Sequence, residues 1–426
     1  MQRTIELLTR LWVVALVLGL IGMGLRLFTG ERLVGYGSYV PWGLWVAIYF
    51  HAVGIAGGVF VVGAIGYFRR VPVLRDHLPV VIWTSLAALV TGLVAIGLDL
   101  GQPTRAYRML TSPNFGSMMA FNSWMYGVFA AVAVICFWLL RRPPGPAGDA
   151  TRSWLVPLLG FGIVLGLAFT SQSGVFLGVV EAKPYWSNPL LPILFLAGAI
   201  ASGAAVLLVI MTFLQADSAN LKDQPFRYLR WVTVGAVFVY FVLEFAKIST
   251  GFWSPTSHAQ EPISLMLFGP FWWVFWVVHL GGGLLALWLL VRGRTVNAVA
   301  TGAFLVALTF VSGRLNVLIP GQSIPELKGL RQAFTHDKLN FYYQATITEY
   351  LVALFLGAFG VGLVYLGLKR LAGFTIRQRE TVNDGPSGLH QAPTPRSLRS
   401  ARQRPAGRGT QAAGDSHRGH SPQWAG

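Results

Sequence analysis

The apolar positions of this 426-residue chain fall into ten long runs, and the segments between them carry most of the polar and basic residues. Each run is long enough to cross a membrane as an α-helix, which takes about 20 residues. The runs cover approximately residues 10–28, 43–67, 80–99, 119–140, 154–176, 190–214, 231–250, 269–291, 297–318 and 346–368. The pattern predicts an all-α polytopic membrane protein with ten transmembrane helices. The first run has no small-residue cleavage site, so we interpret it as a retained helix rather than a signal peptide.

Composition supports the membrane class and limits the cofactors. The chain is 54% hydrophobic and 12% charged, whereas soluble domains carry about 25% charged residues. Of the 33 lysine and arginine residues behind its net charge of +17, ten lie from Lys369 onward, and we do not expect a nucleic-acid partner for a membrane protein of this kind. The single cysteine, Cys136, excludes an internal disulfide and an iron–sulfur cluster held by this chain, because such a cluster takes about four thiolates.

The distribution of lysine and arginine predicts the orientation. The N-terminal segment and the even-numbered loops hold 13 of these residues, the odd-numbered loops and adjacent helix ends hold ten, and the segment from Lys369 onward holds ten. The positive-inside rule therefore places both termini in the cytoplasm. Residues 371–426 are rich in Gly, Pro, Ser, Gln and Arg and lack an apolar period, which predicts a disordered basic cytoplasmic tail.

A possible internal repeat appears at an offset of 145 residues. Ile55-Ala56-Gly57-Gly58 falls on Ile200-Ala201-Ser202-Gly203, and Leu98-Asp99 falls on Leu243-Glu244. Chance similarity and plain close packing of small residues are the alternatives. A true repeat would group helices 2–5 and 6–9 into two four-helix bundles with helices 1 and 10 beside them. The expected divisions are 1–34 (flanking helix), 35–185 (first bundle), 186–320 (second bundle), 321–370 (outer loop and last helix) and 371–426 (tail).

Ionisable residues at the edge of, or within, the apolar runs are functional candidates by default, because charge in hydrocarbon is costly. Asp99 ends the third run just before Arg105, an arrangement that also suits an ordinary helix end at the headgroup level. Glu244 and Lys247 are three residues apart on one helical face, so they form either a neutralising pair or part of a proton path.

The two membrane histidines, His51 and His279, lie at similar depth in helices 2 and 8. Bis-histidine haem ligation is one interpretation, and hydrogen bonding within a bundle is the common alternative. We prefer a quinone-facing His51, because it shares its helix with the aromatic residues Trp45 and Tyr49. No group of His, Cys, Asp and Glu has the sequence spacing of a metal site.

Several stretches, taken in order, resemble one family of membrane subunits. They are YVPWGLWVAIYFHAVGIAGG (Tyr39 to Gly58), LDLGQPTR with the downstream Ser117 and Trp124, SNPLLPILFLAGAIASGAA (Ser187 to Ala205), GRLNVLIPGQSIPELKGL (Gly313 to Leu330) and FYYQATITEY (Phe341 to Tyr350). Together they resemble the NrfD/PsrC-like membrane subunits of polysulfide-reductase-type complexes. The last two stretches resemble the ten-helix branch that includes DsrP, HmcC and HybB.

The resemblance implies a quinone-interacting subunit in a bacterial or archaeal cytoplasmic membrane. Such a subunit exchanges electrons between menaquinone or ubiquinone and a periplasmic ferredoxin-like iron–sulfur subunit, and carries no haem or iron–sulfur cluster of its own. Further subunits of molybdopterin, cytochrome or hydrogenase type complete these complexes, some of them in sulfur metabolism.

The resemblance also implies a quinone pocket in the outer half of the first bundle. Carried onto this sequence, the pocket has Asp99 and His51 as catalytic residues. Glu244 and Lys247, which lie in the second bundle, are a possible proton path outside this pocket. The expected quinone-binding residues are Trp45, Tyr49, Arg105, Asn122 and Tyr126. On this basis Asp99→Asn is expected to slow quinol-linked turnover more than Glu244→Gln.

Two other function classes fit parts of the sequence. A secondary transporter would also have repeats and buried charges, but it predicts broken helices at matching positions of the two halves. A bare membrane anchor would have the helices without a quinone site.

Overall fold

The structure is a computed structural model that describes residues 2–112, 114–142, 153–215, 220–254, 257–327, 329–333, 336, 338, 339 and 341–383. Its internal contacts divide the chain into two units, Met1–Thr375 and Ile376–Gly426. The first unit holds the membrane-spanning helices. Most of the second unit lies outside the described residues, so the predicted disorder of residues 384–426 stays a prediction.

The described residues form helices and contain no strand. Ten helical spans are long and apolar enough to cross a membrane, which confirms the predicted all-α polytopic class. The spanning helices are α1 (Gln2–Thr29), α2 (Leu44–Phe68), α4 (Leu78–Asp99), α6 (Met118–Leu140), α8 (Leu155–Gly178), α9 (Leu191–Leu214), α10 (Gln224–Phe252), η2 with α12 (Val274–Gly281 and Gly282–Arg292), α13 (Val296–Gln322) and α15 (Ile347–Asn383).

Shorter helices occupy four of the connections. They are α3 (Pro72–Asp76), η1 (Pro103–Arg105) with α5 (Arg108–Thr111), α11 (Ser257–Phe268) and α14 (Leu330–Ala333). The hydropathy pattern did not predict α11, because its 12 residues are too few for a membrane span. The last helix also runs to Asn383, beyond the expected boundary at residue 371.

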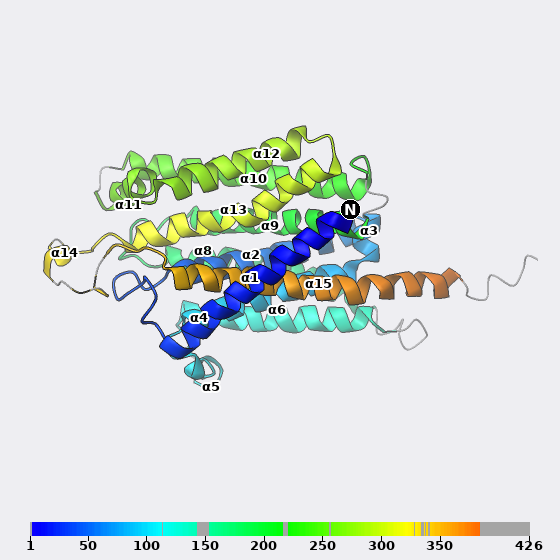
Figure 1. The fold of residues 1–426 in the computed structure, drawn as a ribbon, viewed down its shortest axis with the longest axis horizontal. Coiled ribbons are helices and arrows are strands. Elements are labelled where there is room, and N and C mark those ends of the chain that lie inside the picture. Colours follow the sequence, from blue (N-terminus) through cyan, green and yellow to red (C-terminus); the bar gives the residue numbers. More distant parts are fainter. Residues whose placement is uncertain are drawn as a thin grey trace, which may run out of the picture. The chain divides into compact units, whose positions relative to one another are not determined.

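The two most buried spans, α2 and α9, pack against each other in the middle of the unit (Figure 1). Around them, α2 packs against α4 and α8, while α9 packs against α10 and α13. Small residues allow this contact, since a Cβ on Gly58 would lie 1.9 Å from the carbonyl oxygen of Ala199. Because α2 also contacts α13 and α9 also contacts α8, the division into two separate bundles stays a prediction.

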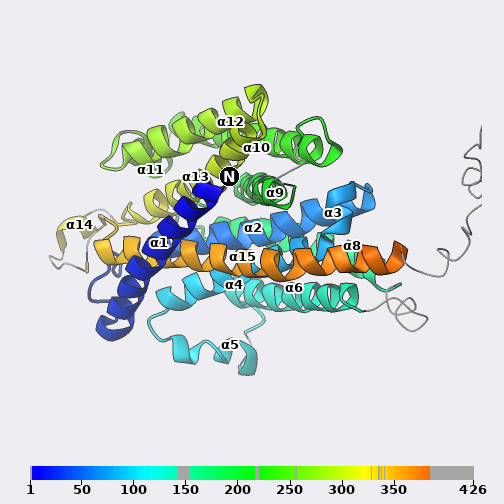
Figure 2. The same cartoon turned by 45° about the vertical axis from the view of Figure 1, so that its right-hand side comes forward.

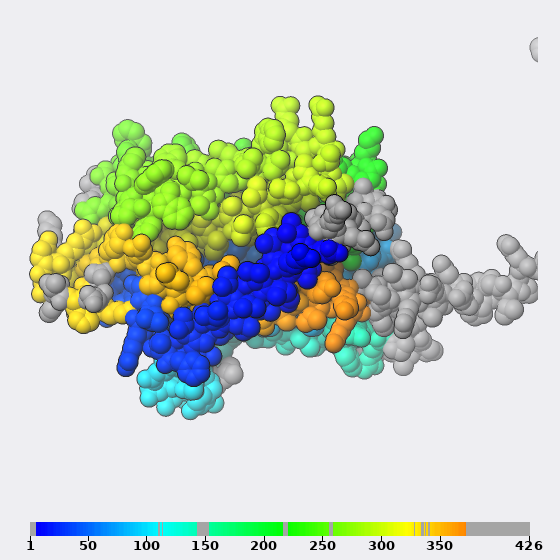
Figure 3. All heavy atoms as spheres, viewed as in Figure 1, coloured from blue at the N-terminus to red at the C-terminus, as the bar shows by residue number. Residues whose placement is uncertain are grey.

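Helices α1 and α15 pack on each other, and α15 packs on α4. The Trp12 indole donates a hydrogen bond to the Ala358 carbonyl (2.8 Å), and the Trp83 indole donates one to the Leu363 carbonyl (2.7 Å). The space-filling view shows α1 lying obliquely across α15 on this face (Figure 3).

One end of the helices carries the longer connections, and we call it the Asp99 end. It includes the described residues of the segments 30–43, 100–117, 179–190, 253–273 and 323–346. The labels α11 and α14 mark it at the left of Figure 2. Side chains join these segments to the helices: Gln322 forms hydrogen bonds of 3.0 Å with both the backbone nitrogen and the carbonyl of Trp42, and the Trp42 ring stacks on Trp186.

Candidate functional site

Two of the predicted quinone-binding residues meet among α2, α6 and α8. The hydroxyl oxygens of Tyr49 and Tyr126 lie 2.8 Å apart, and the Tyr126 hydroxyl is 3.4 Å from that of Ser173. Asn122 lies one turn before Tyr126 on α6, and its side-chain oxygen is buried without a hydrogen-bond partner among the described residues. The structure therefore brings part of the predicted set into one polar cluster.

Asp99 has different surroundings, close to the segment that follows α1. Arg26 on α1 donates from Nε to the Leu98 carbonyl (2.9 Å) and lies 3.5 Å from the Glu31 carboxylate. One oxygen of Asp99 is buried without a hydrogen-bond partner in the described part of the chain, as is the Tyr36 hydroxyl. Burial, and secondarily the nearby Asp99 and Glu31 carboxylates, raise the pKa of Tyr36.

The remaining predicted residues of the first half are placed separately. His51 donates from Nε2 to the Ala307 carbonyl on α13 (2.7 Å), because a carbonyl oxygen can only accept. Trp45 is fully buried and donates to the Glu349 carbonyl on α15 (3.1 Å). Arg105 is exposed in η1. These contacts do not test which residues bind quinone, so the predicted set stays a prediction.

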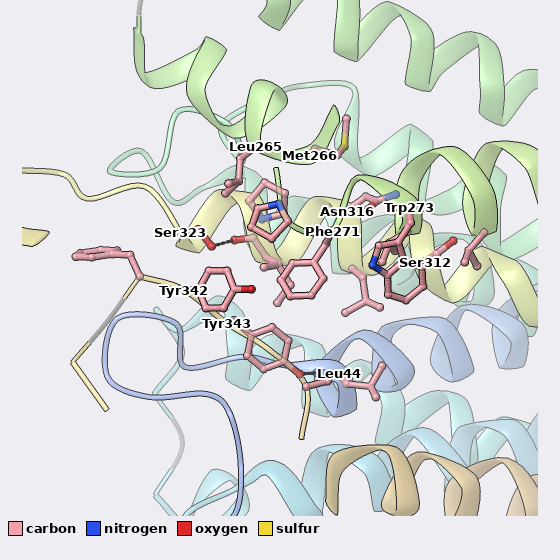
Figure 4. A pocket seen from close by; sticks show the side chains of 18 of the residues that line it. Leu44, Leu265, Met266, Phe271, Trp273, Ser312, Asn316, Ser323, Tyr342 and Tyr343 are labelled. Carbon is pink, nitrogen blue, oxygen red and sulfur yellow. Dashed lines mark hydrogen bonds between the residues drawn. The ribbon is translucent and has the colours of Figure 1, made fainter. Parts of the chain in front are cut away.

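A large cavity lies at the Asp99 end, on the side of α13 that faces α11, η2 and the segment before α15. Its volume is about 810 Å³. Figure 4 shows aromatic and aliphatic side chains projecting into it from several chain segments. The lining residues are Leu44, Leu265, Met266, Pro270, Phe271, Trp273, Val274, Val278, Val311, Ser312, Leu315, Asn316, Ile319, Pro320, Ser323, Arg331, His336, Leu339, Phe341, Tyr342, Tyr343, Ala345 and Tyr350.

One face of α13 forms a long wall of this cavity. The α13 residues fall at positions 311/312, 315/316 and 319/320, the spacing of one helical stripe. Ser312 therefore lies about 15 Å deeper than the end of α13 at Gln322, at 1.5 Å per residue. Arg331 and His336, from the segment after α13, line the opposite, shallower end. The cavity thus runs from polar loops into apolar helices.

Few polar atoms interrupt the apolar lining. Ser312 is 2% exposed, and the Asn316 amide nitrogen is buried without a partner among the described residues. The Tyr343 hydroxyl accepts from the Leu44 backbone nitrogen (2.9 Å) and donates to the Glu349 carboxylate (2.6 Å). An unpartnered buried donor costs free energy, so Asn316 is a candidate for binding a carbonyl or hydroxyl oxygen in the cavity.

A chain of buried polar groups lies behind Ser312. The Nδ1 atom of His279 is 3.1 Å from the Ser312 hydroxyl, and its Nε2 atom is 2.8 Å from Glu244 Oε2. His279 is fully buried, with Tyr240, Phe241, Phe275 and Phe310 ringing it at centroid distances of 5.6–6.2 Å.

His279 belongs to η2, a π-helix from Val274 to Gly281. π-Helical segments are rare and are frequent at functional sites. The continuous apolar run gave no sign of this segment, and the sequence suggested His279 only as a haem ligand or a hydrogen-bonding group within a bundle. The polar residues Ser312 and Asn316, in the apolar run that forms α13, were a signal that could have pointed to this cavity.

Glu244 and Lys247, the predicted proton path, contact different partners. Glu244 pairs with His279, whereas the Lys247 ammonium lies 3.9 Å from the centroid of the Tyr185 ring. Tyr185 donates to the Asn316 carbonyl (2.8 Å). Burial raises the pKa of Tyr185, and the nearby Glu244 carboxylate raises it further. Glu244 and Lys247 therefore lie close to the wall of the cavity, through His279 and Tyr185 respectively.

Within the described residues, no three His, Cys, Asp or Glu side chains are grouped so that they could hold a metal ion. His51 and His279 have the hydrogen-bond partners given above. The expectation that this chain carries neither haem nor an iron–sulfur cluster stays a prediction.

Comparison with known proteins places the chain among membrane subunits of reductases. The profile described as "Polysulphide reductase, NrfD" matches residues 33–326. The chain is 24% identical to a selenate reductase subunit of Mesobacillus selenatarsenatis, over 89% of this chain and 95% of that one. It is 22% identical to the Hdr-like menaquinol oxidoreductase integral membrane subunit of Archaeoglobus fulgidus, over 82% and 89%. It is 26% identical to protein NrfD of Escherichia coli, over 66% and 95%. The chain belongs to the polysulphide reductase NrfD family.

Proposed function

We propose that this chain is the quinone-interacting membrane subunit of a multi-subunit oxidoreductase, and that it exchanges electrons between membrane quinone and an iron–sulfur partner. Membership of the family supports the general class. The names of similar chains support the substrate and the assembly, since they include a menaquinol oxidoreductase integral membrane subunit and a selenate reductase subunit.

The observation that carries the proposal is the cavity beside α13. Its volume of about 810 Å³ is within the range of small-molecule sites, about 300–1,000 Å³. Such sites are mostly apolar and aromatic, with a few polar groups that orient the ligand. Here the aromatic and aliphatic lining suits the ring and prenyl tail of a quinone. Ser312 and Asn316 supply polar groups for its oxygens.

We place the proposed site in this cavity rather than at the Asp99–His51 set. Asp99 lies near Tyr36, while His51 bonds the Ala307 carbonyl. Tyr49 and Tyr126 bond each other. A quinone headgroup in the cavity would instead lie beside Ser312 and Asn316, which are on the same wall.

Oxidation of a quinol to a quinone releases two protons and two electrons. With Cys136 as its one cysteine, this chain cannot ligate an iron–sulfur cluster through cysteines, so the electrons pass to another subunit. We propose that a periplasmic ferredoxin-like subunit docks on the Asp99 end, near the shallow end of the cavity. A molybdopterin, cytochrome or hydrogenase subunit would complete the assembly, in a bacterial or archaeal cytoplasmic membrane with both termini cytoplasmic. Sulfur metabolism is one setting for such a complex.

A transporter fits the structure less well. Broken helices at matching positions are its expected feature, and the π-helix in the second half has no counterpart in the first. The residues 145 positions earlier, 129–136, are α-helical in α6.

A photoreactive quinone analogue tests the proposal in membranes that contain the whole complex. The expected result is labelling of peptides from η2 and α13, suppressed by an excess of the natural quinone. Competed labelling confined to α4 and α6 would instead favour the site predicted from the sequence. No competed labelling anywhere in this chain would contradict the quinone function.

A further inference from the structure

We propose that Ser312, His279 and Glu244 form a proton relay that accepts a proton from a quinol hydroxyl in the cavity. This inference rests on the proposed quinone function and names the residues that carry its proton chemistry. Ser312 contacts the substrate, whereas His279 and Glu244 act through it.

The relay begins at a wall of the cavity and ends in the interior of the second half. Ser312 lines the cavity, and its hydroxyl is 3.1 Å from His279 Nδ1. On the other side of the ring, His279 Nε2 is 2.8 Å from Glu244 Oε2. All three residues are at most 7% exposed, so water does not compete for these hydrogen bonds. Three different helices, α13, η2 and α10, supply them.

The contacts of Ser312 allow two proton arrangements. Its hydroxyl oxygen contacts both His279 Nδ1 and the Thr309 carbonyl, but it has one proton to donate. In the first arrangement the hydroxyl donates to Nδ1, and Nε2 donates to an ionised Glu244. In the second, the hydroxyl donates to Thr309, Nδ1 donates to the hydroxyl, and a protonated Glu244 donates to Nε2. The two arrangements differ by one proton, so uptake or loss of one proton, together with rotation of the Ser312 hydroxyl, interconverts them.

Proton transfer from a quinol converts the first arrangement into the second. The quinol O–H bond breaks and its proton goes to the Ser312 oxygen, as the Ser312 proton passes to Nδ1. The Nε2 proton then passes to Glu244, which becomes neutral. Two electrons pass to the iron–sulfur partner. The second quinol proton leaves to water at the shallow end of the cavity, near Arg331 and His336. Reduction of quinone runs the same steps backward.

The backbone around His279 fits this geometry closely. A Cβ on Gly313 would lie 2.3 Å from the Tyr240 hydroxyl and 2.9 Å from His279 Cε1, so glycine is needed next to Ser312. Lys247, one turn after Glu244 on α10, is also buried, and its side-chain nitrogen lies over the Tyr185 ring.

The test uses the assembled complex and two measurements, quinol oxidation and binding of a redox-inactive quinone analogue. Glu244→Gln keeps the shape of the side chain but cannot accept the proton. Both it and Ser312→Ala are expected to lower kcat by about 10²-fold or more, the usual contribution of general acid–base catalysis. In Glu244→Gln, analogue binding and KM are expected to change less than about threefold, because a loss confined to kcat removes an interaction of the transition state.

Conservative variants separate the relay from a structural role. Ser312→Thr keeps the hydroxyl and is expected to restore most of the rate lost in Ser312→Ala. Ser202→Ala is the matched control, because Ser202 is a buried membrane serine outside the cavity. Wild-type turnover in Glu244→Gln with normal analogue binding would overturn the relay but leave the quinone function standing. Absence of analogue binding in the wild-type complex would instead overturn the quinone function.

Discussion

Gly58 on α2 and Gly203 on α9 touch at the crossing of their helices, although 145 residues separate them in the sequence. A Cβ on Gly203 would lie 2.3 Å from the carbonyl carbon of Gly58. Two further pairs with the same separation also meet: Phe50 with Phe195, at a centroid distance of 5.7 Å, and Gly54 with Ala199. Residues that contact their own equivalents lie on a two-fold axis, so these contacts support the internal repeat.

The crossing predicts a large cost for added volume. Gly203→Ala is expected to destabilise the protein by about 1–3 kcal/mol, the usual cost of overpacking, because the methyl group would meet backbone atoms of α2. Gly235→Ala on α10 is the control, since no atom lies within 4 Å of the position that a Cβ would take there. Thermal unfolding in detergent measures both. An unfolding midpoint for Gly203→Ala equal to that of the control would show that α2 and α9 can move apart at their crossing without loss of stability.

Orientation can be tested with cysteines at exposed positions. Leu327 follows α13 at the Asp99 end and is 68% exposed. Arg292 is the last residue of α12, at the other end of the helices, and is also exposed. Leu327→Cys is expected to react with an impermeant maleimide from outside the cell, and Arg292→Cys only after the membrane is opened. The native Cys136 is fully buried and is expected to stay unlabelled. The reverse pattern would place the Asp99 end in the cytoplasm.

Glu349 on α15 forms hydrogen bonds with the segment after α1 and with the segment before α15, at the Asp99 end. Its carboxylate accepts from the backbone nitrogens of Gly35 (2.8 Å) and Thr346 (3.0 Å) and from the Tyr343 hydroxyl. Tyr343→Phe removes that donor and leaves the Leu44 N–H without its acceptor. The expected loss is about 1–3 kcal/mol, measured as a lower unfolding midpoint. Tyr107→Phe, at a 58% exposed tyrosine, is expected to change little.

The same tyrosine predicts a pH dependence of stability. Burial, and then the Glu349 carboxylate, raise the pKa of Tyr343. A raised pKa in the folded state contributes stability that is complete below the unfolded value of about 10 and is lost as the pH rises above it. Tyr343→Phe is therefore expected to make the alkaline decline in the unfolding midpoint shallower. An unchanged slope would mean that the Tyr343 phenol ionises alike in the folded and unfolded chains.

The sequence predicted the fold well because each membrane span is a local property of the chain. The family resemblance also grouped Tyr49 with Tyr126, whose hydroxyl oxygens lie 2.8 Å apart. The cavity could not be predicted, because its walls come from α11, η2, α13 and the segment before α15. The partners of His51 and Trp45 were equally hidden, since both donate to backbone carbonyls, which any residue provides.

The two candidate sites predict opposite effects of two variants on the rate of quinol oxidation. If quinone binds at the site predicted from the sequence, Asp99→Asn loses more of this rate than Glu244→Gln. The cavity and its relay reverse that order, because Glu244 connects to the cavity through His279, whereas Asp99 is not among its lining residues. Inhibitor-sensitive rates of the assembled complexes decide between them. A loss of quinol oxidation in Asp99→Asn alone would indicate that quinone binds in the first half of the molecule.

The most direct test of the quinone site fills the cavity. Val278 lines it, whereas its neighbour Val277 on the same π-helix is 59% exposed on the outer surface. We expect Val278→Trp to abolish quinol oxidation and analogue binding in a complex that still assembles, because the indole occupies the space of the headgroup. Val277→Trp is expected to keep both. Full quinol oxidation by Val278→Trp would contradict a quinone site in this cavity.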